Sequence, residues 1–385
     1  MSKLTIDRRS LLKAGAASLF LAGMPVSGLA KGKAAGRICV IILQGGMDGL
    51  ATVPPIGDPD LMRMRKAISP ENYLPLNDFF GLHPALKFYA QLMARGHASA
   101  VHATAFPYTK RSHFEGQNVI EGGGLSPFSE KTGWLGRSLD LAGVAGRSLS
   151  LDMPLILRGH HDNDNFYPAS IRGSGRPSSK LLEKIAMGHD MEAAQVFTKV
   201  ARKSEENIQV PRDPASLAQY AGQAMAKANG PLASVIRVDD FDTHANQVYQ
   251  DNTDEGRLAR QLGVVDEVIA GYRRGLGDAW DNTIILTLTE FGRTVAANGT
   301  LGTDHGYGSV GLLAGGTLVA NGVVADWPGL SKKDQFDQRD LMATIDYRSV
   351  CAACVEKTLG LEHDVIASQV FRQPDLPRVF DHLFA

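Results

Sequence analysis

The fold is decided by Ile38-Cys39-Val40-Ile41-Ile42-Leu43, an uninterrupted apolar run that leads into Gly45-Gly46-Met47-Asp48-Gly49. An apolar run without alternation is typical of a strand buried on both faces, as in a parallel sheet. Similar runs occupy residues 98–103, 233–238, 284–289 and 310–313. We predict that all five are strands of a parallel sheet, in which ligands bind beyond the carboxyl ends of the strands.

Helical patterns lie between these runs. The clearest covers residues 255–274, where apolar side chains recur at spacings of four and three: Leu258, Leu262, Val265, Ile269 and Tyr272. Alternating strands and helices predict a three-layer α/β/α sandwich with a mostly parallel sheet. Residues 180–228 have a polar helical pattern, and we expect an insertion or cap there.

The amino terminus has the layout of a secretory signal peptide over residues 1–30, with an apolar run from Ala14 to Met24 and small residues before Ala30. Its basic part, Asp7-Arg8-Arg9-Ser10-Leu11-Leu12-Lys13, resembles the twin-arginine motif. The apolar run is shorter than the roughly 20 residues of a spanning helix. We therefore expect export by the twin-arginine translocase to the periplasm, with no membrane span in the mature protein.

Composition excludes some partners. The chain has 385 residues, with 40 Lys plus Arg against 41 Asp plus Glu, so no basic field favours nucleic acid or an anionic membrane. Three cysteines are too few for a disulfide scaffold. Cys351 and Cys354 could form an oxidised pair, but we favour small side chains on the core face of a helix.

Two early segments place polar residues where a strand ends or a helix begins. Asp48 follows a strand and two glycines, so its carboxylate could bind a cation, although an Asp in a turn is as good an interpretation. Ser112 precedes a predicted helix, beside Arg111 and His113. It could be a nucleophile stabilised by the helix amides, or an N-cap in capping-box register with Glu115.

The segment from Asp239 to His244 follows another predicted strand. Asp240 with His244, or Asp242 with His244, could close on one cation, because mixed carboxylate and imidazole shells suit zinc or manganese. Three acids in four residues would repel one another without a cation or a basic partner. The alternative is a polar loop with helix caps.

The longest polar segment runs from Glu290 to Gly306. Glu290 ends a buried strand, and Asp304-His305, flanked by glycines, is a second ligand pair. Arg293 is a candidate donor to an anionic substrate oxygen. The alternative is a surface hairpin with a buried Glu290–Arg293 ion pair.

Five motifs resemble the bacterial family called domain of unknown function 1501, whose members often begin with a twin-arginine signal. The motifs, in order, are Gln44-Gly45-Gly46-Met47-Asp48-Gly49-Leu50, Arg111-Ser112-His113-Phe114, Phe241-Asp242-Thr243-His244-Ala245-Asn246-Gln247, Glu290-Phe291-Gly292-Arg293-Thr294 and Gly302-Thr303-Asp304-His305-Gly306. That family in turn looks like a remote relative of the alkaline phosphatase and sulfatase superfamily. This resemblance implies an alkaline phosphatase-like domain over residues 31–385, with one or two metals and a hydroxyl or modified-cysteine nucleophile.

The superfamily resemblance implies roles for individual residues. Asp48 is similar to the metal-binding Asp after the first strand, and Ser112 to the nucleophile. Asp240 with His244 resembles an Asp-x-x-x-His ligand pair, and His305 resembles a late ligand.

One departure affects the strand that ends at Glu290. The superfamily has an Asp-His ligand pair there, whereas this chain has Glu290-Phe291. Phe291 cannot coordinate, so Asp304 would have to replace the missing ligand. Alternatively, Asp304-His305 aligns directly with the Asp-His ligand pair of the superfamily.

These observations predict a periplasmic metal-dependent hydrolase of small phosphate or sulfate esters. Ser112 would attack in line, with one or two zinc, manganese or calcium ions. The catalytic candidates are Ser112, Arg111, His113 and Arg293, and the metal-ligand candidates are Asp48, Asp240, Asp242, His244, Glu290, Asp304 and His305. The Pro-Arg context of formylglycine sulfatases is missing after Ser112, which disfavours that branch.

Two other functions remain open. A degenerate site would leave a binding or assembly module of the envelope on the same fold. A redox protein with an organic cofactor is a weaker interpretation, because no dinucleotide, haem or iron–sulfur motif occurs.

Overall fold

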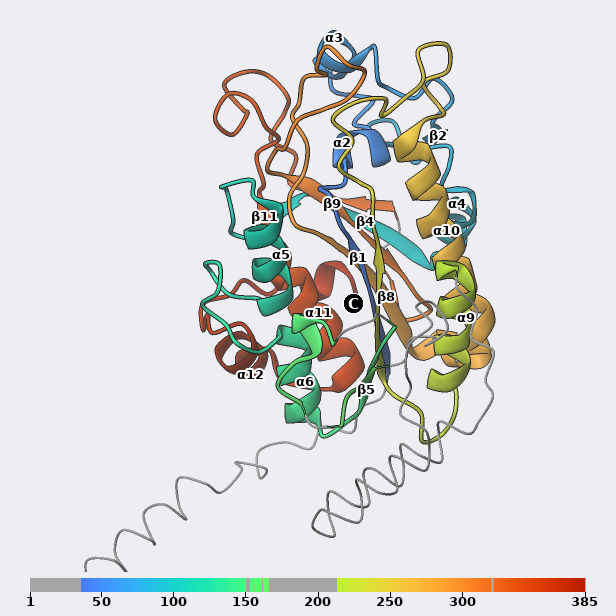
Figure 1. Ribbon diagram of the computed structural model, residues 1–385, viewed down its shortest axis with the longest axis vertical. Helices are drawn as coiled ribbons and strands as arrows, with labels where there is room; N and C mark the ends of the chain where they lie inside the picture. Colours follow the sequence, from blue (N-terminus) through green and yellow to red (C-terminus); the bar gives the residue numbers. More distant parts are fainter. Residues whose placement is uncertain (1–35, 150–152, 161, 166–212, 320–321, 385) are drawn as a thin grey trace, which may run out of the picture.

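The strands form one mixed, mostly parallel sheet between two layers of helices (Figure 1). The computed structural model describes residues 36–149, 153–160, 162–165, 213–319 and 322–384. Within these residues the nine-stranded sheet has the order β10-β4-β9-β8-β1-β7-β5-β6, and β11 pairs with β4. The strands are β1 (Arg37–Leu43), β4 (Ala98–Ala105), β5 (Gly146–Ser148), β6 (Asp164–Asn165), β7 (Ala233–Val238), β8 (Thr283–Thr289), β9 (Ser309–Ala314), β10 (Gly322–Val324) and β11 (Ile345–Asp346).

The five predicted strands are confirmed as β1, β4, β7, β8 and β9, but the direction predicted for residues 310–313 is wrong. β9 runs antiparallel to both of its neighbours, β4 and β8. A parallel neighbour needs a crossover connection, usually a helix. The connection from β8 to β9, residues 290–308, contains no helix, so the chain returns from the same edge of the sheet.

The two faces of β1 pack against different helices, which gives the predicted three-layer sandwich. Ile38, Val40 and Ile42 belong to a core with α5 (His113–Gly122), α6 (Trp134–Ala142) and α11 (Tyr347–Leu359). The alternating residues, from Cys39 to Leu43, belong to a second core. That core includes α4 (Lys87–Ala94), α9 (Pro214–Met225) and α10 (Arg257–Leu276). Figure 1 shows these two sets of helices on opposite sides of the sheet.

The predicted helix 255–274 is confirmed as α10, and its five apolar side chains are all buried. α10 packs closely along α9, which also contacts β7. α9 is therefore part of a helical layer rather than the cap expected for residues 180–228. The rest of that expectation, residues 180–212, lies outside the described residues, as does the predicted signal peptide.

Cys351 and Cys354 lie on α11 with no exposed surface. Burial raises the pKa of both thiols. The core-facing interpretation of this pair is therefore confirmed. Three short helices complete the layers and the loops: α2 (Gly49–Thr52), α3 (Leu61–Arg65) and α12 (His363–Val365). In the part of the chain that the structure describes, no helix is both long and apolar enough to cross a membrane.

Candidate functional site

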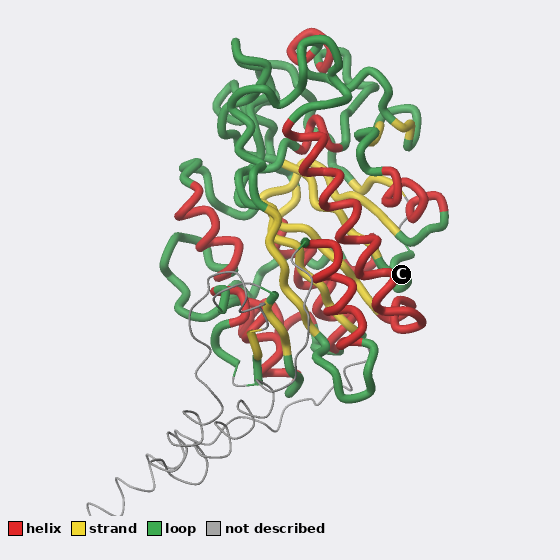
Figure 2. Tube along the Cα trace, turned by 45° about the vertical axis from the view of Figure 1, so that its right-hand side comes forward, coloured by secondary structure: helices red, strands yellow, loops and turns green. Residues whose placement is uncertain are grey.

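Three central strands end at the same level, and this brings the residues after them together. Leu43, the last residue of β1, pairs with Val238 of β7 and with Thr289 of β8. The loops that follow gather at this end of the sheet (Figure 2). His305 reaches the same edge for a different reason, because it precedes the antiparallel β9, whose amino end lies there.

The double glycine after β1 allows the close packing of this edge. Gly45 and Gly46 have φ of 118° and 75°, a region that favours glycine. A Cβ on Gly45 would lie 2.3 Å from the Asp242 amide nitrogen, and one on Gly46 would lie 2.6 Å from the Phe291 ring. Larger residues at these positions would push the β7 and β8 loops away from β1.

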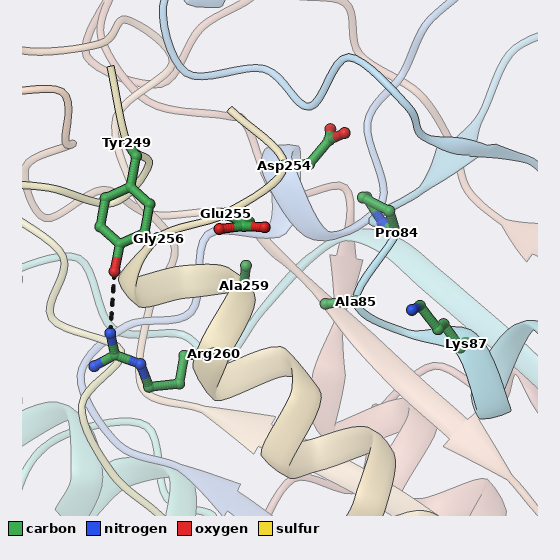
Figure 3. Close-up of a pocket in the computed structure, with 9 residues that line it drawn as sticks. All are labelled: Pro84, Ala85, Lys87, Tyr249, Asp254, Glu255, Gly256, Ala259 and Arg260. Atoms are coloured by element: carbon green, nitrogen blue, oxygen red, sulfur yellow. Dashed lines mark hydrogen bonds between the residues drawn. The ribbon is translucent and has the colours of Figure 1, made fainter. Parts of the chain in front are cut away.

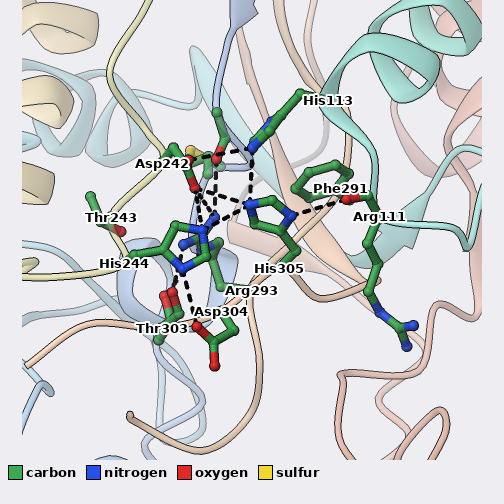
Figure 4. Close-up of polar contacts among 12 residues, drawn as sticks. Arg111, His113, Asp242, Thr243, His244, Phe291, Arg293, Thr303, Asp304 and His305 are labelled. Carbon is green, nitrogen blue, oxygen red and sulfur yellow. Dashed lines mark hydrogen bonds and ion pairs between the residues drawn. The ribbon is translucent and has the colours of Figure 1, made fainter. Parts of the chain in front are cut away.

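Side chains from the start of α5 and from two loops form the candidate metal centre (Figure 4). His113, Asp242 and His305 each offer a ligand atom within 4.8 Å of the others. The Nε2 atoms of His113 and His305 are 3.0 Å apart, and Asp242 Oδ1 is 3.1 Å from His305 Nε2. His244 lies on the other side of His305, with its Nε2 2.9 Å from His305 Nε2 and 3.1 Å from Asp242 Oδ1.

Each of the three imidazoles turns its Nδ1 toward an oxygen that can only accept. The pairs are His113 with Glu290 Oε1 (2.7 Å), His244 with Asp304 Oδ1 (3.0 Å) and His305 with the Arg111 carbonyl oxygen (2.9 Å). A neutral imidazole carries one proton, which these partners place on Nδ1. The Nε2 lone pairs then face one another and a carboxylate, an arrangement that is repulsive without a cation.

The donor set fits a divalent cation. Imidazole nitrogen and carboxylate oxygen are ligands of zinc and manganese. Tetrahedral bonds of about 2.0–2.1 Å place neighbouring ligand atoms about 3.3 Å apart. The contacts of 2.9, 3.0 and 3.1 Å around His305 Nε2 are close to that spacing. Carboxylate and carbonyl partners on the outer nitrogens are also typical of metal-binding histidines.

Neighbouring charges favour ionised carboxylates here. Burial raises the pKa of Asp242, but the hydrogen bond and charge of Arg293 and the nearby histidines outweigh it, so the net pKa is lowered. The hydrogen bond from His244 lowers the pKa of Asp304. Anionic oxygens at these positions suit a cation.

The two histidines of the group are shifted in opposite directions. The hydrogen bond to Glu290 raises the pKa of His113. Burial lowers the pKa of His305, and the charges of His113 and Arg293 lower it further. Of these two imidazoles, His305 is therefore the one whose surroundings oppose a second proton.

Glu290 lies behind His113 instead of in the ligand group. Its side chain has no exposed surface, and Oε1 accepts from both His113 and the Gly45 amide (2.8 Å). Glu290, which we expected to be a ligand, therefore contacts the ligand group only through His113 Nδ1. Phe291 packs against His113 and His305, with ring centroids 4.9 Å from each, and forms an apolar wall.

Arg293 lies beneath the group, with 0% of its side chain exposed. Nη1 donates to Asp242 Oδ1 (2.7 Å) and to the Gly45 carbonyl (3.2 Å). Nε and Nη2 donate to the hydroxyl and carbonyl of Thr303 (3.2 and 2.5 Å). The expectation that Arg293 holds substrate oxygens is corrected, because its donors are used inside the protein to hold Asp242.

Arg111 also has a role different from the expected one. Its guanidinium points away from the histidines (Figure 4). It pairs with Asp340 (2.6 Å) and with Asp337 (2.8 Å). Only its carbonyl oxygen contacts the centre, through His305.

Two predicted ligands lie outside the group. Asp48 is 1% exposed and pairs with Arg65, while Gln247 donates to it at 2.6 Å. It also accepts from the Ala51 amide (3.3 Å) and so caps α2. Asp240 is exposed and has a φ of 70°. Asp242, rather than Asp240, is the carboxylate that closes on the histidines.

Ser112 lies in the chain between two residues that contact the centre. Arg111 holds His305 through its carbonyl, and His113 is in the ligand group. The capping box is not formed, because Ser112 makes no side-chain cap and Glu115 instead accepts from the Tyr108 hydroxyl (2.8 Å). Tyr108 also accepts from the Ser112 amide (3.1 Å). The Ser112 side chain therefore stands at the start of α5 without a capping role.

Sequence reasoning missed the polar network under the centre. The Gln247 amide oxygen accepts from Thr243 and Thr303 hydroxyls (2.8 and 2.9 Å), while its nitrogen donates to Asp48. Gln247 thus links the β1 and β7 loops to the loop before β9. The only sign of this role in the sequence was that Gln247 ends the motif that begins at Phe241. His113 was expected to be catalytic, and its position in the ligand group was not foreseen.

A separate hollow of about 430 Å³ lies beside the start of α10 (Figure 3). Its lining includes Tyr249, whose hydroxyl accepts from Arg260 (3.2 Å), and Asp254, which accepts from the Glu71 and Asn72 amides. None of the predicted site residues lines it. The histidine centre, where the predicted residues gather, is therefore the candidate functional site.

Comparison with solved structures finds low similarity over most of the chain. The periplasmic domain of EcEptC from Escherichia coli is 11% identical, with 90% of this chain and 88% of that chain covered and a TM-score of 0.38. The lipoteichoic acid synthase LtaP from Listeria monocytogenes is 10% identical, with 76% and 70% covered and a TM-score of 0.39. The phosphonate monoester hydrolase of Agrobacterium radiobacter is 9% identical, with 72% and 67% covered and a TM-score of 0.32.

Sequence comparison finds a family match over part of the chain. No curated protein matches the chain. A family model described as "Protein of unknown function (DUF1501)" matches residues 179–353, which include Asp242, His244, Glu290 and His305. The resemblance noted in the sequence motifs is thus confirmed over these residues, where the chain is similar to the DUF1501 family.

Proposed function

We propose that the protein is a metal-dependent hydrolase of phosphate or sulfate esters. One observation carries the proposal: His113, His244 and His305 all turn Nδ1 toward acceptors, so their Nε2 lone pairs meet the Asp242 carboxylate. A bound cation would relieve the repulsion in this arrangement. The resemblance of the motifs to the alkaline phosphatase and sulfatase superfamily supports the same reaction class.

Ser112 is the proposed nucleophile. Its hydroxyl oxygen would bond to phosphorus or sulfur as the bond to the leaving alcohol breaks, and water would then release the acid from the serine. The first amides of α5 have no capping side chain, so they can donate to the non-bridging oxygens of the ester. These amides would hold the non-bridging oxygens, which we had expected Arg111 and Arg293 to do.

The protein residues hold the reacting groups. His113, Asp242 and His305 would bind one divalent cation, for which zinc or manganese suits the imidazole nitrogens better than calcium, and this cation would stabilise charge on the attacking and leaving oxygens. Asp242 Oδ2 faces His113 (3.5 Å) and Oδ1 faces His244 Nε2 (3.1 Å), so this carboxylate could bridge two cations, with Asp304 orienting His244 through Nδ1. Glu290 and Arg293 orient the ligands from below.

The cellular location forms part of the proposal. The twin-arginine motif at Arg8-Arg9 supports export by the twin-arginine translocase and a periplasmic site of action. To test this location, the full chain is expressed as wild type and as the Arg8→Lys plus Arg9→Lys double variant. Cell fractionation then shows whether each protein reaches the periplasm. Export unaffected by the double substitution would contradict it.

A catalytically degenerate binding or assembly module is the second candidate. Two observations favour it: Asp48 is engaged by Arg65 away from the histidines, and Phe291 occupies a position where the superfamily has a ligand. Such a module would hold no metal at stoichiometric level. The metal content of the exported protein therefore separates the two functions.

Turnover of p-nitrophenyl phosphate, bis-p-nitrophenyl phosphate and p-nitrophenyl sulfate tests the enzyme directly. The wild type, supplied with zinc, manganese or calcium, should hydrolyse at least one of these. Ser112→Ala and His244→Ala should lose that activity. Unchanged turnover in both variants would remove the proposed assignment of the site.

A further inference from the structure

We propose that Asp340 is a positioning residue that fixes His305 from two sides, through Arg111 and Arg339. The inference rests on the proposed metal centre. Asp340 has 0% exposed side-chain surface. Its Oδ2 accepts from Arg111 Nε and Nη2 (2.8 and 2.6 Å), and its Oδ1 accepts from Arg339 Nε (2.9 Å). Both carboxylate oxygens are thus engaged by guanidinium groups.

The first guanidinium controls the His305 ring. Arg111 has a φ of 60°, which costs energy for a residue with a side chain and persists only where the surroundings fix it. In this conformation its carbonyl oxygen lies 2.9 Å from His305 Nδ1. Asp340 holds the Arg111 side chain, and the Phe336 ring lies 5.8 Å beneath the guanidinium. The restraint on the side chain therefore fixes the direction of the carbonyl.

The second guanidinium controls the His305 backbone. Arg339 Nη2 donates to the His305 carbonyl oxygen. The Arg339 carbonyl in turn accepts from the Val295 amide (3.0 Å), and the Leu341 carbonyl accepts from the Gly308 amide (2.9 Å). The segment around Asp340 is thus hydrogen-bonded to the loop that carries His305 at one position before His305 and at one position after it.

Asp340 itself lies outside the ligand group and can act on it only through the two arginines. Its removal would leave Arg111 Nε and Arg339 Nε without their carboxylate partner and release both restraints on His305. Loss of a residue that orients a metal ligand typically lowers the metal affinity by about 10–100-fold. A residue with a purely structural role would change stability without changing the ligand geometry.

Asp337 provides a matched control. It also pairs with Arg111 (2.8 Å), but its side chain is 59% exposed. Arg111 keeps both of its Asp340 contacts when Asp337 is replaced. Asp337→Asn and Asp340→Asn therefore remove the same charge from two partners of one arginine, and only the second should disturb His305.

The test uses the mature protein loaded with Co²⁺, whose visible absorption reports the arrangement of ligands. Zinc affinity is measured in parallel by competition with a chromophoric chelator, and circular dichroism checks folding. Asp340→Asn should alter the cobalt spectrum and weaken zinc binding by about 10–100-fold. Asp337→Asn should keep the wild-type spectrum and an affinity within about threefold of wild type.

A spectrum and affinity for Asp340→Asn equal to those of Asp337→Asn would overturn the inference while leaving the metal centre intact. A wild-type protein that binds no cobalt would instead overturn the proposed function. If Asp340→Asn fails to fold, Arg111→Gln replaces it, since this variant keeps the backbone carbonyl but loses the clamp. It should then shift the cobalt spectrum, and an unshifted spectrum would again overturn the inference.

Discussion

His244 and His305 bring their Nε2 atoms to 2.9 Å from each other, although 61 positions separate them in the chain. His305 also contacts His113 and Asp242, so it is the most connected member of the centre. Its side chain is 24% exposed, compared with 46% for His244. This difference predicts unequal effects of losing the two imidazoles.

His305→Ala should weaken zinc binding by more than about 100-fold, because every other ligand contacts this ring. His244→Ala should weaken it by about tenfold, since the group of His113, Asp242 and His305 stays complete. Isothermal titration with zinc measures both. Equal losses in the two variants would show that the centre is not built around His305.

Glu290→Gln should weaken metal binding by about 10–100-fold, because the carboxylate orients His113 through Nδ1. Chelator competition gives the affinity. Glu267→Gln is the matched control, since Glu267 is exposed on α10, away from the centre. A Glu290→Gln protein with wild-type affinity would mean that His113 needs no partner.

Ser112→Ala should lower kcat by at least about 10³-fold if Ser112 is the nucleophile. It should change the free energy of unfolding by less than about 0.5 kcal/mol, because its side chain caps nothing. Asp213→Ala serves for comparison, since Asp213 caps α9 by accepting from the Ser216 amide (2.8 Å). That variant should lose about 0.5–2 kcal/mol. A similar loss in Ser112→Ala would restore the capping interpretation.

Arg293→Lys should lower the free energy of unfolding by about 1–3 kcal/mol, because a lysine cannot reproduce the fork that joins Asp242, Gly45 and Thr303. It should also weaken metal binding through Asp242. Urea unfolding and zinc titration measure the two effects. The opposite pattern, a raised KM with unchanged stability, would identify Arg293 as a substrate contact after all.

His102 predicts acid sensitivity of the fold away from the centre. It is fully buried, its Nδ1 accepts from the Ala103 amide (2.7 Å), and its Nε2 then donates to the Val53 carbonyl (2.9 Å). Burial lowers its pKa from 6.5 to about 4. The unfolded chain therefore binds more protons between these values, so stability is full above pH 6.5 and falls as the pH drops toward 4. The loss amounts to about 3 kcal/mol.

Urea unfolding of wild type and His102→Asn at pH 7, 5.5 and 4.5 checks this slope. The variant is less stable at pH 7 but should lose less stability on acidification. Identical slopes would assign the acid sensitivity to other groups.

Much of the sheet follows from the sequence, because strands buried on both faces need continuous apolar runs, as in Ile38–Leu43 and residues 233–238. The direction of β9 could not be read from such a run. It depends on the return of residues 290–308 along one edge without a helix. The predicted meeting of Asp242 with His305 was nevertheless found, because the antiparallel strand brings its amino end to that edge.

The roles of the charged residues were harder to predict. Arg293, Arg111 and Asp48 were expected to face a ligand, but each is engaged by a partner at least 17 positions away in the chain: Asp242, Asp340 and Arg65. A single sequence contains no record of such pairs. Local spacing also could not separate Asp240 from Asp242, since the choice depends on the φ of 70° at Asp240.

Anomalous diffraction from crystals of the mature protein, recorded at the zinc and manganese edges, tests the metal centre most directly. We expect a peak bounded by His113 Nε2, His305 Nε2 and the Asp242 carboxylate, which is lost in His305→Ala crystals. Crystals grown with saturating metal that show no peak there, or a peak only elsewhere on the protein, would contradict it.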